Sequence, residues 1–134
     1  MGIPAYLYLL RAKDLIDSSY GAPLDVPALA QAAFASPAHF IRSFKRAFGE
    51  TPHQYLQRRR IERAKELLRE SDLTVTEVCL EVGFQSLGSF STVFRALVGE
   101  PPSTYRERWN ASPPPAIPAC YTLMFTRPTE VQRP

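Results

Sequence analysis

Apolar residues recur with helical periodicity from near the start of this 134-residue chain. Between Ala5 and Ile16 they return at intervals of three and four positions, which places them along one face of a helix. The residues from Tyr20 to Pro23 end that pattern, and helical spacing resumes after them. Strict alternation of apolar and polar residues, typical of a half-buried strand, extends over no useful length. The pattern therefore predicts an all-α fold.

Capping signals divide the rest of the body into six more helices, for about seven in all. A serine, threonine or aspartate can accept a hydrogen bond from the first helical turn, and proline is favoured at the first helical position. Thr74 and Glu77 have the spacing of a capping box. These signals predict helices over about 25–33, 36–49, 51–70, 74–83, 86–98 and 102–109. The longest has its candidate core positions at Tyr55, Leu56, Ile61, Ala64, Leu67 and Leu68.

The composition changes after Asn110. Six prolines between Pro113 and Pro134 exclude a regular helix across most of this segment. Its one apolar stretch, from Cys120 to Phe125, has three possible fates: packing on the body, pairing with a partner as a strand, or remaining in solvent. We therefore divide the chain into a helical domain over 1–110 and a Pro-rich tail over 111–134.

The helical domain repeats itself at an offset of 50 residues. The ten residues from Gly49 recur from Gly99 with glycine, glutamate, proline, tyrosine and arginine at the same places. Phe40 and Phe44 likewise have phenylalanine counterparts fifty residues later. Upstream of Ser36 the offset is 49, because the second copy has one extra residue in its turn.

Each copy consists of a short helix, a tight turn and a longer helix, which is the layout of a DNA-reading helix-turn-helix. We predict a first unit over 24–49 and a second over 73–99, joined by a linker helix over 51–70. The linker would be about 28 Å long, near the ~34 Å that separates successive major-groove entries on one face of DNA. The alternative is an αα-hairpin repeat used only for packing.

Charge is concentrated in one segment of the chain. The net charge is +3, whereas the segment from Arg42 to Arg69 holds nine basic residues against three acidic ones. Such a run is either a solvated helix face or a nucleic-acid surface. The first longer helix favours DNA, because its phenylalanines point inward and its outward positions carry His39, Arg42, Lys45 and Arg46.

Other functional classes find little support in the sequence. The hydrophobic fraction of 45% and the charged fraction of 22% are ordinary for a globular protein. We find no metal-ligand spacing, nucleophile elbow or glycine-rich phosphate loop. We therefore expect that the protein is not an enzyme and binds no metal or cofactor. The longest apolar stretch, from Ile3 to Leu10, is too short to span a bilayer and lacks the basic start of a signal peptide. We expect a cytoplasmic protein with no membrane partner.

The combined motifs resemble one known family. They cover the chain from about Ala5 to Trp109 and comprise Ala30; Ser36, Pro37, His39, Phe40, Arg42, Phe44 and Lys45; Gly49, Pro52 and Tyr55; Arg60, Ile61, Ala64, Leu67 and Leu68; Val82, Gly83 and Phe84; and Phe90, Phe94, Arg95, Gly99, Pro102, Tyr105 and Arg106. In this order and spacing they are similar to the DNA-binding domain of the AraC/XylS family of bacterial transcription regulators.

The resemblance implies a function and a set of site residues. The longer helix of each unit, about 36–48 in the first and 86–98 in the second, would enter one of two adjacent major grooves of double-stranded DNA at a promoter. The protein would then affect recruitment of RNA polymerase. It implies base-facing roles for Pro37, Ala38, His39, Ile41, Arg42, Gln85, Ser86, Leu87, Gly88, Ser89, Ser91 and Thr92. Phosphate contacts, which set register without reading sequence, are implied for Lys45, Arg46 and Arg95.

The sequence departs from this family pattern in two ways. Gly88 offers no side chain and Leu87 no hydrogen bond where related proteins often have amides, so we expect weak direct readout by the second helix, with a thymine methyl as the partner left for Leu87. Many family members also carry an effector-binding domain. This chain has no length for one, so we expect no small-molecule effector within it.

Several residues also have purely structural interpretations. His39 is more typical of a structural hydrogen bond at a helix start than of a DNA contact. The arginines of the linker helix predict a solvated or internally paired face, with a salt bridge for Arg60. Cys79 is predicted to be a buried, inert thiol. As an alternative function, the helices would bind RNA polymerase or another regulator and DNA only weakly.

Overall fold

A computed structural model describes residues 4–111 of the chain, and all regular secondary structure within this range is helical. The prediction of an all-α fold with about seven helices is confirmed. None of the helices between residues 4 and 111 is long and apolar enough to cross a membrane. The predictions for the tail concern residues outside the described part. The helices are α1 (Ala5–Ser19), α2 (Val26–Ala32), α3 (Pro37–Phe48), α4 (Pro52–Glu70), α5 (Val75–Glu81), α6 (Leu87–Val98) and α7 (Pro102–Ala111).

Local caps set the starts of these helices, as the sequence predicts. Ser36 accepts a hydrogen bond from the amide of His39. Thr51 and Gln54 form a reciprocal capping box at the start of α4, and Thr74 and Glu77 do the same for α5. Because each cap satisfies amides that lack a partner within the helix, the boundary is determined by a few neighbouring residues.

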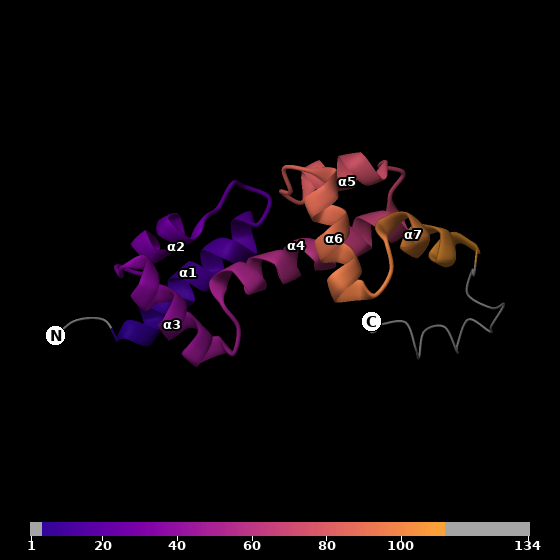
Figure 1. Cartoon of the computed structure of the whole chain (residues 1–134). Coiled ribbons are helices and arrows are strands. Elements are labelled where there is room, and N and C mark those ends of the chain that lie inside the picture. Colours follow the sequence, from indigo (N-terminus) through magenta and orange to yellow (C-terminus); the bar gives the residue numbers. More distant parts are fainter. Residues whose placement is uncertain (1–3, 112–134) are drawn as a thin grey trace, which may run out of the picture.

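The helices form two hydrophobic cores along α4 (Figure 1). α1 and α3 pack at the N-terminal half of α4, and α2 packs against both of them. α5, α6 and α7 pack at the C-terminal half of α4. The buried face of α4 passes from Leu56 in the first core to Ile61 in the second. Leu67, a predicted core position, is half-buried at the edge of the second core. α4 therefore contributes to both cores and connects the two helix-turn-helix units.

Arg60 lies at the middle of α4, and its predicted salt bridge is wrong. Arg60 is 9% exposed, and its guanidinium donates to two backbone carbonyl oxygens, from Nε to Tyr20 at 2.6 Å and from Nη2 to Ala22 at 2.9 Å. Burial lowers the pKa of Arg60 below its usual range. The role is structural, but carbonyl oxygens take the place of the expected carboxylate.

Candidate nucleic-acid interface

The longer helix of each helix-turn-helix unit, α3 in the first and α6 in the second, has the same caps and the same buried positions. Each begins at a serine cap and ends at a glycine in the left-handed region, with φ of 84° at Gly49 and 99° at Gly99. In α3, Phe40 and Phe44 are completely buried, and in α6 their counterparts Phe90 and Phe94 are too. Two phenylalanines four positions apart fix which face of each helix points to solvent.

Burial follows the same order in both helices, residue for residue. Each position of α3 has the same burial class as the position fifty residues later in α6. The residues predicted to face DNA therefore lie on equivalent surfaces of the two units. All of them are exposed except Ile41 and Ser91, which are half-buried and occupy equivalent positions; the exposed ones are Pro37, Ala38, His39, Arg42, Lys45, Arg46, Gln85, Ser86, Leu87, Gly88, Ser89, Thr92 and Arg95.

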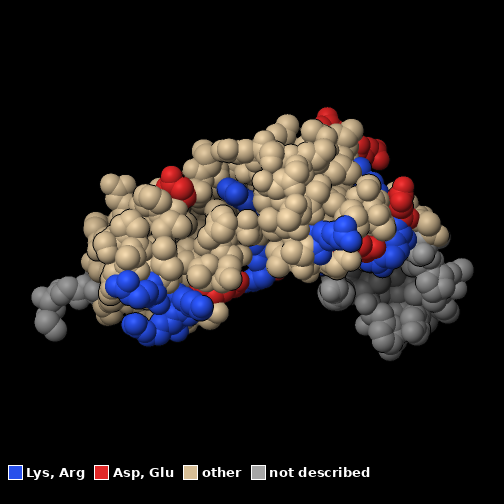
Figure 2. Space-filling view, in the orientation of Figure 1, with Lys and Arg blue, Asp and Glu red and all other residues tan. Residues whose placement is uncertain are grey.

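The exposed face of α3 carries unpaired positive charge. Arg42, Lys45 and Arg46 form no ion pair with any carboxylate in the described part of the chain. Figure 2 shows a compact group of basic atoms over the region where Figure 1 draws α3. Their charge is available to an external anion, since no carboxylate within residues 4–111 neutralises it.

The basic residues of α4 are mostly engaged within the protein. Arg58 donates to Glu50 at 2.8 Å and to Glu62, and Arg59 donates to Asp17 at 3.0 Å. Arg63 pairs with Glu66 in the same way. The hydrogen bond to Glu50 raises the pKa of Arg58. Of the basic segment seen in the sequence, the part on α3 therefore provides the unpaired cationic surface.

α6 offers different chemistry on the same surface. Its first exposed positions are Leu87, which is 44% exposed, and Gly88, and Leu97 is 52% exposed further along. Arg95 is its one basic residue and occupies the position of Lys45. Most of the surface over α6 in Figure 2 is uncharged. A face of this kind provides hydroxyl and apolar contacts rather than charged hydrogen bonds.

His39 has a partner that the sequence reasoning missed. Its Nε2 lies 3.3 Å from the hydroxyl oxygen of Ser43, one turn further along α3. The spacing of four residues on one helix face is the signal that could have identified this pair. Since His39 is exposed as well as hydrogen-bonded, its two interpretations are compatible.

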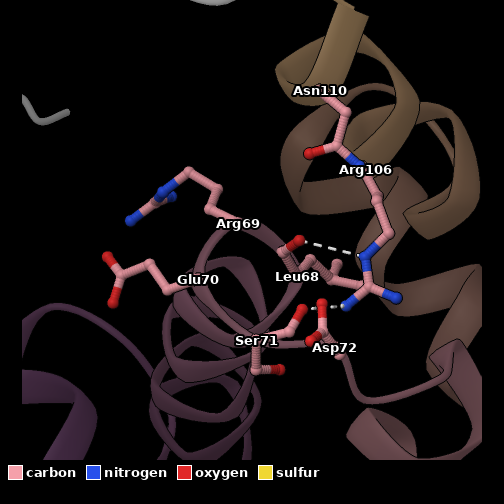
Figure 3. A pocket seen from close by; sticks show the side chains of 7 residues that line it. All are labelled: Leu68, Arg69, Glu70, Ser71, Asp72, Arg106 and Asn110. Carbon is pink, nitrogen blue, oxygen red and sulfur yellow. Dashed lines mark hydrogen bonds between the residues drawn. The ribbon is translucent and has the colours of Figure 1, made fainter.

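A shallow polar pocket lies elsewhere, between the C-terminal end of α4 and α7 (Figure 3). Arg106 points into it and donates from Nε to the Leu68 carbonyl at 3.0 Å, with a further bond to the Ser71 carbonyl. These carbonyl oxygens end α4 and have no amide partner within the helix. The pocket therefore results from side-chain capping of α4 and lies apart from the surfaces of α3 and α6.

Comparison with known proteins identifies this arrangement. A family model described as a helix-turn-helix domain matches residues 29–108, which is more than half of the chain. The domain of AdpA, solved in complex with a target DNA, superposes with a TM-score of 0.75 at 31% identity, over 81% of this chain and 97% of that one. The chain belongs to the AraC-type helix-turn-helix family. An AraC-type regulator from Chromobacterium violaceum superposes at 26% identity with a TM-score of 0.69, covering 78% of this chain and 94% of that one.

Proteins similar in sequence are named as transcriptional regulators, and one of them, AdaA of Bacillus subtilis, is named a bifunctional transcriptional activator and DNA repair enzyme. LumQ of Photobacterium leiognathi, named a probable transcriptional regulator, is 34% identical over 100 residues, which are 75% of this chain and 40% of LumQ. The match thus covers less than half the length of that relative. Membership of the AraC-type family accounts for the two tandem units joined by α4. It agrees with the resemblance seen in the sequence motifs.

Proposed function

We propose that this chain binds double-stranded DNA sequence-specifically as a transcription regulator, with α3 and α6 in adjacent major grooves. The observation that carries the proposal is the exposed, unpaired group of Arg42, Lys45 and Arg46 on α3. Binding of such a group to duplex DNA is favourable because each neutralised phosphate releases condensed counterions. That AdpA, with 31% identity, was solved with a target DNA supports the same conclusion.

The length of α4 supports a two-groove arrangement. With 19 residues it is about 28 Å long, which is close to one helical turn of DNA. Since α3 and α6 pack at opposite halves of α4, their exposed faces can follow one side of a duplex. A single chain would then read two successive grooves without a dimer.

The two helices would divide the work unequally. Arg42 would make a bidentate contact with guanine, while Lys45, Arg46 and Arg95 would contact phosphates. α6 presents Leu87 and Gly88 first, and these suit contact with a thymine methyl or with DNA shape more than hydrogen bonding. Sequence discrimination should therefore be concentrated under α3.

The bound protein would act on transcription by affecting the recruitment of RNA polymerase. This second partner is proposed on the family resemblance and on the transcriptional regulators to which the chain is similar. In the alternative function, contacts to polymerase or another regulator would dominate and DNA affinity would be weak.

Selection of preferred sequences from random duplex DNA tests the proposal. We expect one site, with two half-sites about one helical turn apart and more information in one half than in the other. Titration of that site and of random duplex at 50 to 200 mM salt should give a steep loss of affinity together with a retained preference for the site. Binding that is weak and indifferent to sequence would overturn the proposal and favour the protein-interaction module.

A further inference from the structure

The two units meet beside the middle of α4, where the loop between α1 and α2, just before the first helix-turn-helix, touches the end of α5 and the turn that follows it. The loop after α1 extends toward the turn between α5 and α6 (Figure 1). A Cβ atom added to Gly21 would lie 3.1 Å from the Glu81 carbonyl oxygen, and one added to Gly83 would lie 2.8 Å from the Tyr20 carbonyl oxygen. The backbones of the two units are therefore in close contact, with no room for a side chain between them.

Arg60 joins this contact from α4. It donates to the carbonyls of Tyr20 and Ala22 in the loop just before the first unit, and its guanidinium lies 5.8 Å from the centre of the Phe84 ring in the second unit. A Cβ on Gly83 would also lie 3.0 Å from Arg60 Nε. One side chain thus binds the loop of one unit and packs against the turn of the other.

The repeat loses its symmetry at this contact. With the offset of 49, Gly83 corresponds to Phe34, and both residues are in the left-handed region, with φ of 101° and 54°. Phe34 is 70% exposed and packs edge-on against Tyr8, so the first unit tolerates a large side chain there. The second unit has glycine at the equivalent place, where the neighbouring unit fills the space. Contact between the units, beyond the turn geometry, explains this difference.

We propose that Arg60 is a positioning residue that sets the spacing of half-sites the protein accepts. This inference rests on the proposed function and adds a determinant of specificity outside α3 and α6. Arg60 lies where α4 passes from one core to the other, and bending or twisting there changes the relative orientation of the recognition helices. By holding the loop after α1 against the turn before α6, it opposes that motion.

Binding to sites of altered spacing tests the inference. One inserted base pair moves the second half-site by about 3.4 Å and rotates it by about 34°. Wild-type protein should lose at least about tenfold in affinity for a site with one base pair inserted or removed, relative to the selected site. Arg60→Met keeps a long side chain without hydrogen-bond donors. The affinity that this variant loses when one base pair is inserted or removed should be less than about threefold.

Arg63→Met is the matched control. It removes the same charge from α4 one turn away, and its partner Glu66 lies on the same helix, so the contact between the units stays intact. Its spacing profile should equal that of the wild type. Affinity for a duplex carrying the α3 half-site alone should be the same in all three proteins. This half-site measurement reports a distorted recognition helix separately from altered spacing.

A second variant allows the inference to be tested even if the Arg60→Met protein does not fold. Gly21→Val places a branched side chain from an exposed loop against the Glu81 carbonyl and should widen the accepted spacing in the same way. Equal spacing profiles for wild type and for the folded variants would overturn the inference while leaving the proposed function standing. Failure of the wild type to prefer any site would overturn the proposed function instead.

Discussion

Arg42 and Arg46 provide a sharp comparison on α3, because they differ in expected role and little else. Both are exposed, lie one turn apart on the same helix and form no ion pair within residues 4–111. Replacing either with alanine should change the free energy of unfolding by no more than about 0.5 kcal/mol. Any difference in DNA binding then reports the interface and not the fold.

For Arg42→Ala we expect a loss confined to the specific site. A bidentate contact with guanine contributes about 1–3 kcal/mol of discrimination, which corresponds to roughly 5- to 150-fold in affinity. Binding to random duplex should change much less, since phosphate contacts dominate it. The ratio of the two affinities should therefore fall toward one.

For Arg46→Ala we expect a similar proportional loss on both DNAs. If Lys45, Arg46 and Arg95 each neutralise one phosphate, they contribute about 2.7 to the slope of log affinity against log salt, and the variant removes about 0.9 of it. Fluorescence anisotropy titrations at four salt concentrations measure both the affinity and its salt slope.

Equal losses on cognate and random DNA for Arg42→Ala would refute its base-reading role.

Three further predictions follow from other parts of the molecule. Single-base changes under α3 should each cost about 1–3 kcal/mol of binding free energy and those under α6 less, which competition titrations measure; equal sensitivity would contradict the unequal division of readout. Gly49→Ala should cost about 1–2 kcal/mol of unfolding free energy through left-handed strain alone, whereas Gly83→Ala should cost distinctly more because its Cβ meets the Tyr20 carbonyl. Urea unfolding of the two variants decides this, and equal losses would count against the contact. Burial and the hydrogen bond to Asp17 raise the pKa of Tyr55 to about 12 from an ordinary 10, so the stabilisation it provides is complete below pH 10 and lost as the pH rises through 12. Tyr55→Phe should lack this pH-dependent loss in urea unfolding between pH 9 and 12, and coincident profiles would contradict it.

The helices could be predicted because their determinants are local. Ser36, Thr51 and Thr74 accept hydrogen bonds from amides three residues ahead, so a short stretch of sequence contains the whole signal. The tandem arrangement was predictable for a related reason, since two copies of one pattern imply two copies of one unit. The exposed positions of α3 followed from its phenylalanine spacing.

The use of the arginines could not be predicted, because their partners are distant in sequence. Arg59 binds Asp17, 42 positions away, and Arg60 binds carbonyl oxygens about 40 positions away. A count of charges gives the net charge of a segment but not which charges are already neutralised. For the same reason Gly83 was predicted only as the end of a helix, while the structure adds a neighbour from the other unit.

The shared order of buried and exposed positions in α3 and α6 has a consequence for how such a protein changes over evolutionary time. Positions that hold each helix in place and positions that face outward are separate sets, so outward residues can drift without loss of the fold. Under the proposed function, one helix can then keep its DNA contacts at existing promoters while the sequence preference of the other changes. Duplication of the unit thus allows regulatory targets to shift gradually, with neither copy losing its scaffold.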